Sequence, residues 1–256
     1  MLGLGSSISA PTYLGASYAD GFSIDLDGTN DYLINADFNK EVLKSGMSVG
    51  TWFKIDAASG TTFIAGCWQG ASKAQTWAIR VTSASKINWI IRMSNDGNKY
   101  VESSAITDGA WHHAVGTFTK NGNVELFIDG SSVGTSATGA DLELQVTDSQ
   151  SDNSGTVQTG IGIGTRAPDN LGGYFNGHVN DVGIWTEALD ADAVAAIYNS
   201  GTPTDLTVDD GNYDNSDTLV GYWKMEEGTG TTVADSSTNS IALTLTNGPT
   251  FSTDTP

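Results

Sequence analysis

Paired carboxylates are the first chemistry to look for in this chain, because retaining glycoside hydrolysis needs two of them about 5 Å apart. Glu125 and Asp129 share a strand face by parity in GNVELFIDG. Asp129, however, precedes Gly130 in a turn dipeptide, where a short acceptor side chain stabilises the turn. We therefore expect no catalytic residues. A polysaccharide-active hydrolase or lyase, with carboxylates assembled from different strands, is the alternative.

The three histidines raise the question of a metal site. They are His112, His113 and His178. Adjacent residues on a strand point to opposite faces, so His112 and His113 are poorly placed to hold one ion. We expect one of these two imidazoles to pack inside and its neighbour to lie on the outer face.

Calcium is the better metal candidate, because oxygen donors are abundant in the loops. Asp210, Asn212 and Asp214 form the D-x-N-x-D start of a calcium loop. Asn215 stands where glycine is expected, and no Glu occupies the twelfth position. The chelate is therefore incomplete, and a solvated turn is the alternative.

Glycan binding needs an exposed aromatic platform with planar amides or carboxylates beside it. Trp68 in CWQGASK and Tyr174 in LGGYFNG fall at loop edges and are the candidate glycan-binding residues. Tyr100 is a further aromatic of interest. Trp89 lies between apolar neighbours, and the five remaining tryptophans lie in strand cores, so burial is expected for them.

The elements that must position these residues are short alternating segments bounded by Gly, Asn, Asp and Ser. Expected strands cover 22–26, 31–35, 47–55, 62–68, 75–82, 87–93, 99–104, 111–119, 123–129, 132–136, 157–163, 178–186 and 218–225. LDADAVAAIYNSG predicts one short helix near 190–199, with Asp190 as its N-cap. The fold class is therefore all-β, an antiparallel two-sheet sandwich with one short helix.

Composition limits the partners. The 256 residues carry a formal charge of −19, which argues against nucleic acid and against an anionic membrane, since both attract basic surfaces. The single cysteine, Cys67, excludes an intramolecular disulfide. The first twenty residues lack the basic and apolar regions of a signal peptide, so synthesis in a host cytoplasm is expected.

Four segments carry a resemblance to a known family: FSIDLDGTNDYLINAD, MSVGTWFK, DGAWHHAVGTFTKNGNVELFIDGSSVG and IGIGTRAPDNLGGYFNGHVNDVGIWTEALDADAVAAIYNSG. In this order they resemble the laminin-G-like, concanavalin A-like jelly rolls, including pentraxin-related members, over about residues 20–201. We expect an arm at 1–20 and a single jelly-roll domain at 21–256. Because a lone strand and turn cannot fold alone, 218–248 should supply closing strands beside the N-terminal ones.

The resemblance also implies two calcium positions in loops. Their ligands would be Asp27, Asn30, Asp31, Asn180 and Asp181 at one position, and Asp169 and Asn170 at the other. The first position assumes that the two ends of the domain lie side by side. For each position a solvated turn is again the alternative.

The Gly/Ser-rich start and the ending LVGYWKMEEGTGTTVADSSTNSIALTLTNGPTF are also similar to virion structural proteins of marine tailed bacteriophages. This resemblance implies a non-catalytic protein on the virion surface, attached to virion or capsid proteins through residues 1–20, binding cell-surface glycans and stabilised by calcium. Tyr18 and Phe22 belong to an arm that can order on a partner at an entropic cost, and a free linker is the alternative. A free carbohydrate-binding module is another alternative, and a homo-oligomer is open.

Overall fold

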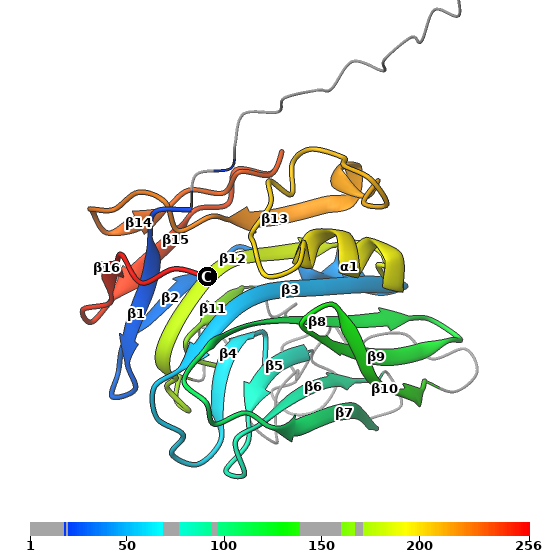
Figure 1. Ribbon diagram of the computed structural model, residues 1–256, viewed down its shortest axis with the longest axis horizontal. Helices are drawn as coiled ribbons and strands as arrows, with labels where there is room; N and C mark the ends of the chain where they lie inside the picture. The colour runs from blue at the N-terminus through cyan, green and yellow to red at the C-terminus, as the bar shows by residue number, and fades with distance from the viewer. Residues whose placement is uncertain (1–17, 19, 69–76, 94–96, 139–159, 167–170) are drawn as a thin grey trace, which may run out of the picture.

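Two antiparallel sheets form the molecule in the computed structural model, which describes residues 18, 20–68, 77–93, 97–138, 160–166 and 171–256 (Figure 1). In spatial order, sheet A contains β10 (Ser131–Ala137), β9 (Asn123–Ile128), β8 (Trp111–Thr119), β3 (Gly46–Ile55), β12 (Asn176–Trp185), β1 (Ser23–Asp27) and β16 (Thr250–Ser252). Strand β13 (Leu219–Trp223) also pairs with β12, beyond the stretch that β1 covers. The prediction of an all-β antiparallel sandwich is confirmed.

Sheet B packs against sheet A and is also eight-stranded. Its spatial order is β14 (Thr232–Val233), β15 (Leu243–Thr246), β2 (Tyr32–Asn35), β11 (Ile161–Ile163), β4 (Thr62–Gly66), β5 (Trp77–Val81), β6 (Lys86–Arg92) and β7 (Asn98–Ala105). Strands far apart in sequence are neighbours in both sheets, since β15 pairs with β2 and β16 pairs with β1. Segment 219–252 thus adds strands to both layers.

The inner faces of the two sheets share one large hydrophobic core. At its centre, the Trp89 ring of β6 lies against Gly116 of β8, where an added Cβ would come within 2.2 Å of the ring. The indole Nε1 donates to the Thr117 carbonyl at 2.9 Å, so the buried polar atom is satisfied. This contact joins the two sheets at a point that only glycine fits.

Helix α1 (Ala191–Tyr198) is the one α-helix in the described part of the chain, and it covers the outer face of sheet A beside β12 and β3 (Figure 1). Asp190 caps it, because its carboxylate accepts from Ala193 N at 2.8 Å. Val194 and Ile197 then pack on a second core that includes Trp185. The predicted short helix and its N-cap are confirmed.

Two short 3-10 helices, Lys40–Leu43 and Ser216–Thr218, complete the elements. No helix among the described residues is both long and apolar enough to cross a membrane. Trp111 is the one tryptophan whose expected burial is not observed. It is half-buried, because it is the first residue of β8.

Candidate functional site

A row of cross-strand neighbours crosses the outer face of sheet B. Phe63 of β4 pairs with Arg80 of β5, Arg80 pairs with Asn88 of β6, and Asn88 pairs with Glu102 of β7. Arg80 Nε donates to Asn88 Oδ1 at 2.8 Å, and Asn88 Nδ2 donates to Glu102 Oε1 at 3.2 Å. The row therefore holds a guanidinium, an amide and a carboxylate in fixed orientations.

Two guanidinium groups lie over aromatic rings on this face. Arg80 Cζ is 5.7 Å from the centre of the Trp68 ring, and Arg166 Cζ is 5.5 Å from that of Phe63. Phe63 and Trp68 belong to one small buried cluster with Ala78 and Ile90. The rings orient the two cations, and the donors that the rings do not engage can bind a planar anionic or hydroxyl-rich ligand.

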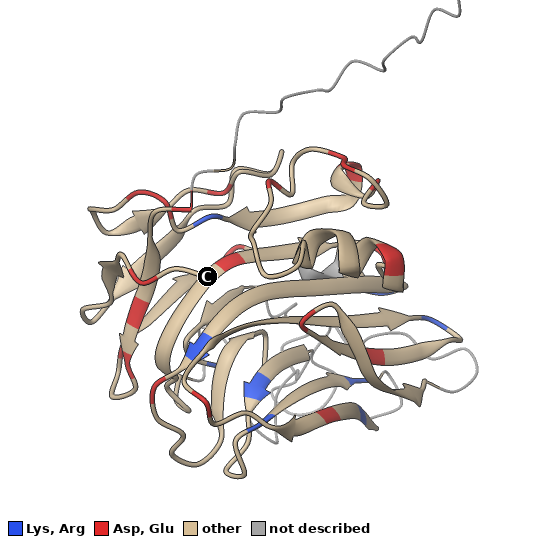
Figure 2. Cartoon of the chain, viewed as in Figure 1, with Lys and Arg blue, Asp and Glu red and all other residues tan. Residues whose placement is uncertain are grey.

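The charge distribution makes this face unusual for so acidic a chain. Of the three arginines, Arg80 and Arg92 lie on β5 and β6, and Arg166 lies over Phe63 of β4. Figure 2 shows blue segments on β5 and β6, whereas red predominates in the loops around β13. Burial lowers the pKa of Arg80 while Glu102 raises it, and the guanidinium stays charged at any physiological pH.

The aromatic candidates have different exposures from those expected. Trp68 is only 6% exposed, because it supports Arg80 from below, so it is not the open platform that its loop-edge position predicted. Tyr174 is half-buried and stacks on Tyr32, with ring centres 6.2 Å apart. Tyr100 of β7 is 55% exposed and offers the open aromatic surface that Trp68 does not.

The first expected calcium position is not assembled, because strand register separates its two halves. Asp27 pairs with Asn176, so Asn180 lies four residues further along β12, about 13 Å at 3.3 Å per residue. Within the turn itself, Asp27 Oδ1 accepts from Thr29 N at 2.7 Å, and the Asn30 carbonyl accepts from Asn247.

Asp31 is 6% exposed, and burial raises its pKa. Its Oδ2 is 3.4 Å from the Asp27 backbone N, which donates to it. The DGTND turn is therefore held largely by its own hydrogen bonds. The carboxylates of Asp27 and Asp31 form no joint calcium site with Asn180 and Asp181 of β12.

Asn180 and Asp181 instead hold the segment that precedes β1. Asn180 Nδ2 donates to Asp20 Oδ1 at 2.6 Å, while Asp181 Oδ1 accepts from the hydroxyls of Tyr18 and Tyr222 at 2.5 and 2.7 Å. Asp181 is 3% exposed, with φ of 48° in an irregular stretch of β12. Burial raises its pKa to about 8, and its Oδ2 has no hydrogen-bond partner among the described residues.

The remaining calcium candidates give no closed ligand set. The backbones of Asp210 and Tyr213 pair in both directions, at 2.9 and 3.0 Å, and the side chains of Asp210, Asn212 and Asp214 point to solvent. No hydrogen bond or ion pair joins those three side chains within the described chain. Asp169 and Asn170 lie outside the described residues.

The two carboxylates considered as a catalytic pair, Glu125 and Asp129, have separate structural roles. Glu125 accepts from the Ser132 hydroxyl, whereas Asp129 has φ of 51° and accepts from His113 N and His112 Nδ1 at 2.9 and 2.7 Å. Residues 130–134, GSSVG, do match the letters of a G-x-S-x-G nucleophile motif. They lie on hairpin strand β10, however, rather than on the strand-to-helix turn that such a nucleophile requires.

The adjacent histidines occupy different environments, as strand alternation requires. His112 lies between Asp129 and Asp108, and these hydrogen bonds, outweighing burial, raise its pKa to about 9. His113 is buried in a cluster with the Trp52 and Tyr198 rings, and burial lowers its pKa to about 4. The two imidazoles therefore do not share an ion.

Comparison with known proteins identifies solved structures that share this architecture. Several solved structures share the fold, including a proposed carbohydrate-binding protein of Bacteroides ovatus ATCC 8483, with TM-score 0.62 and 16% identity over 91% of this chain and 59% of that one. The heptameric SAP-like pentraxin of Limulus polyphemus has TM-score 0.59 and 17% identity, covering 91% and 94%. The CBM40 of a Ruminococcus gnavus IT-sialidase, bound to α2,3-sialyllactose, has TM-score 0.52 and 14% identity, covering 69% and 96%.

These identities show a shared fold and no more. The chain spans 59% of the length of the Bacteroides ovatus protein. No curated protein matches the sequence. The sequence profile of the concanavalin A-like lectin/glucanases superfamily, in its Laminin_G_3 form, matches residues 27–195, which is more than half of the chain. The chain therefore belongs to the concanavalin A-like lectin/glucanases superfamily.

Proposed function

We propose that this chain is a non-catalytic glycan-binding domain that takes acidic glycans on the outer face of sheet B. The observation that carries the proposal is the partly exposed Arg80 guanidinium and the exposed Glu102 carboxylate, which hydrogen bonds to the buried Asn88 amide hold in place. Sugar hydroxyls pair with such planar polar groups, and an exposed aromatic, here Tyr100, supplies an apolar surface beside them.

The acidic class of glycan follows from charge. A chain of net charge −19 repels polyanions overall, yet its three arginines lie on or over the strands of one sheet. Guanidinium groups bind carboxylate or sulfate in a bidentate manner, so they compensate locally for that repulsion. Sialyllactose, the ligand of the Ruminococcus gnavus domain, carries such a carboxylate and is consistent with this choice.

Binding of alginate and chondroitin sulfate, with a neutral β-glucan as the reference, tests the proposal in affinity electrophoresis. Arg80→Gln and Arg166→Gln should each weaken binding of the acidic polymers by about 10- to 150-fold, since a charge-assisted contact contributes about 1.5–3 kcal/mol. Lys120→Gln is the charge-matched control, because Lys120 follows β8 in sheet A.

Two outcomes would overturn this proposal. One is equal retardation of wild type and both arginine variants by every acidic polymer, at a salt concentration that preserves binding. The other is release of reducing ends from any of the polymers, lost in Glu102→Gln, which would favour the hydrolase or lyase alternative.

We also propose display on a virion surface, with residues 1–20 contacting virion or capsid proteins and calcium bound in the acidic loops. The sequence resemblance supports the virion role, and the acidic turns support calcium. Tyr18 and Asp20 lie at the root of this arm and bind Asp181 and Asn180. Co-sedimentation of the chain with purified particles tests the location, and its absence from washed particles would favour the free binding module.

A further inference from the structure

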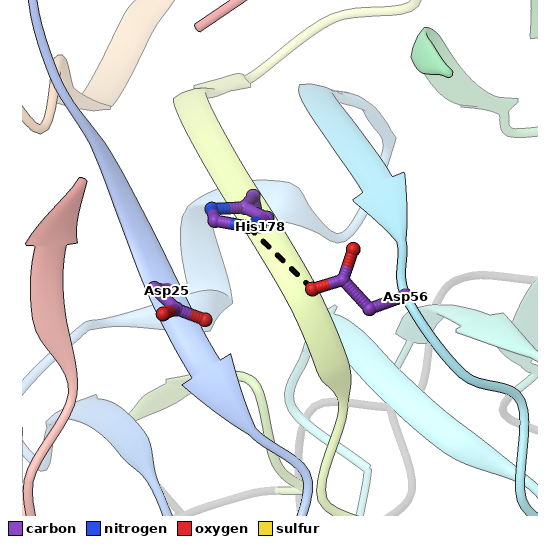
Figure 3. Close-up of side chains that lie close together, drawn as sticks. All are labelled: Asp25, Asp56 and His178. Atoms are coloured by element: carbon purple, nitrogen blue, oxygen red, sulfur yellow. Dashed lines mark ion pairs between the residues drawn. The ribbon is translucent and has the colours of Figure 1, made fainter. Parts of the chain in front are cut away.

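A second polar row lies on the outer face of sheet A, on the opposite side of the sandwich from the arginines. Asp25 of β1 pairs with His178 of β12, and His178 pairs with Lys54 of β3. Asp56 follows β3 directly and reaches back toward the same imidazole (Figure 3). Sequence reasoning missed this group because its members come from three strands and only register brings them together.

The spacing of the three side chains fits a metal ion. One candidate ligand atom each from Asp25, Asp56 and His178 lies within 4.8 Å of the others. His178 Nε2 is 3.5 Å from Asp56 Oδ2, close to the roughly 3.3 Å between two ligand atoms of a tetrahedral zinc ion at bond lengths of about 2.0–2.1 Å. Asp56 is exposed, so its side chain can close the remaining gap.

The hydrogen bonds of His178 favour the tautomer that binds metal. The residue is 8% exposed, and its Nδ1 lies 3.5 Å from Ser23 Oγ. The Ser23 hydroxyl donates its proton to the Asp254 carbonyl at 2.7 Å, so its oxygen is left to accept from Nδ1. With the proton on Nδ1, the Nε2 lone pair is available to a metal ion, whose charge would replace the proton that otherwise pairs Nε2 with Asp56 Oδ2 at 3.5 Å.

The neighbouring cation forms its ion pair with a carboxylate outside this group, and it also interacts electrostatically with Asp56. Lys54 forms its ion pair with Asp254, which also accepts from Trp111 Nε1 at 2.8 Å. Asp25 forms no hydrogen bond or ion pair through its carboxylate among the described residues. Asp25 and Asp56 therefore converge on one imidazole, while the ion pair of Lys54 is formed with Asp254.

We propose that Asp25, Asp56 and His178 bind a divalent transition-metal ion of the zinc type, with solvent completing its coordination. An imidazole with two carboxylates suits such an ion, whereas calcium needs six to eight oxygen ligands. A Ser-His-Asp hydrolase is excluded as the reading of Ser23, His178 and Asp56, because Ser23 is fully buried and its hydroxyl is committed to a carbonyl.

Titration of the chelator-treated full chain with Zn²⁺ by calorimetry, and with Co²⁺ by visible absorption, tests this site. One ion per chain should bind, and Asp56→Asn and His178→Gln should each weaken Zn²⁺ at least about tenfold. Loss of the Co²⁺ ligand-field bands in His178→Gln would report imidazole coordination directly. His112→Gln is the matched control, because His112 also lies beside two carboxylates but both its ring nitrogens are engaged.

If His178→Gln fails to fold, Asp56→Asn still tests the site, because Asp56 is exposed. Circular dichroism verifies the fold of each variant. No binding of Zn²⁺ up to 100-fold excess would overturn the proposal, as would an equal loss of affinity in His112→Gln. Calcium binding that displaces Zn²⁺ and disappears in Asp56→Asn would overturn the assignment to a transition metal.

Discussion

At the scale of single residues, Asp181 stands out because the fold confines a carboxyl group that water would normally solvate. Its Oδ1 accepts from Tyr18 and Tyr222, whereas the buried Oδ2 has no partner in the described chain. Asp20 and Glu226 lie close by, and Lys224 is the compensating cation, itself bonded to Asp205. Desolvation therefore raises the pKa of Asp181 to about 8.

We predict that this carboxyl group makes stability fall as the pH rises. The unfolded chain releases the Asp181 proton near pH 4, while the folded chain keeps it until about pH 8, so the free energy of unfolding decreases across that interval. Asp181→Asn mimics the protonated form and still accepts from both tyrosines. Urea denaturation at pH 5 and pH 8 should show a smaller loss of stability for the variant than for wild type.

Two nearby groups must be separated from this effect. Burial raises the pKa of Asp20 to about 6, so Asp20 also lowers the free energy of unfolding as the pH rises toward 6. His112 has a pKa of about 9, so it lowers the free energy of unfolding as the pH rises above 6.5. Both groups remain in Asp181→Asn, so the difference between the two proteins reports Asp181 together with its electrostatic coupling to Asp20. Parallel pH profiles for wild type and variant would contradict the prediction, and Asp210→Asn, which alters an exposed carboxylate, serves as the reference.

At the scale of elements, the Trp89 ring against Gly116 joins the two sheets most tightly. Gly116→Ala should lower the free energy of unfolding by about 1–3 kcal/mol, because the added methyl overlaps the ring and β8 cannot move without its neighbours in the sheet. Gly46→Ala is the matched control, since the nearest atom to its added methyl is 3.5 Å away. Equal thermal midpoints for the two variants would refute this role.

Element by element, alternation and caps made most of the fold predictable. The thirteen expected strands and the helix capped by Asp190 correspond to observed elements. Sequence reasoning delimited none of the short strands β14, β15 and β16, which have two to four residues.

The candidate sites were less predictable, because they depend on register rather than on parity. An offset of four positions along β12, from Asn176 to Asn180, separates the expected calcium ligands, and no local pattern encodes that offset. The same holds for Arg80, Asn88 and Glu102, which are 8 and 14 residues apart and meet only across β5, β6 and β7. Propensity identifies strands, whereas long-range pairing decides which side chains converge.

At the scale of the whole molecule, the two sheets present different surfaces. Sheet B carries the row of Arg80, Asn88 and Glu102 on its outer face. Sheet A carries α1 together with the Asp25, Asp56 and His178 group. Since opposite faces of a sandwich are separated by two sheet layers, a ligand on one face does not contact the other. Glycan and metal binding are therefore expected to be additive, with mutations on one face sparing the other.

The molecule as a whole also depends on its last fifty residues. Trp223 and Met225 are fully buried in the main core, β13 and β16 cover edges of sheet A, and β15 covers β2 in sheet B. The family match ends at residue 195, before any of these strands. We predict that a chain ending at Gly201 shows no cooperative thermal transition, because exposed strand edges and a core without Trp223 remain.

Adding segment 202–256 as a separate polypeptide provides the control for that truncation, because it restores the missing strands without restoring the covalent connection. A cooperative transition should return in the mixture, measured by near-ultraviolet circular dichroism of the buried tryptophans. The free energy of unfolding should then depend on fragment concentration, since association contributes by mass action. A truncated chain that melts cooperatively near the full-length midpoint would mean that residues 219–252 decorate a sandwich already complete without them.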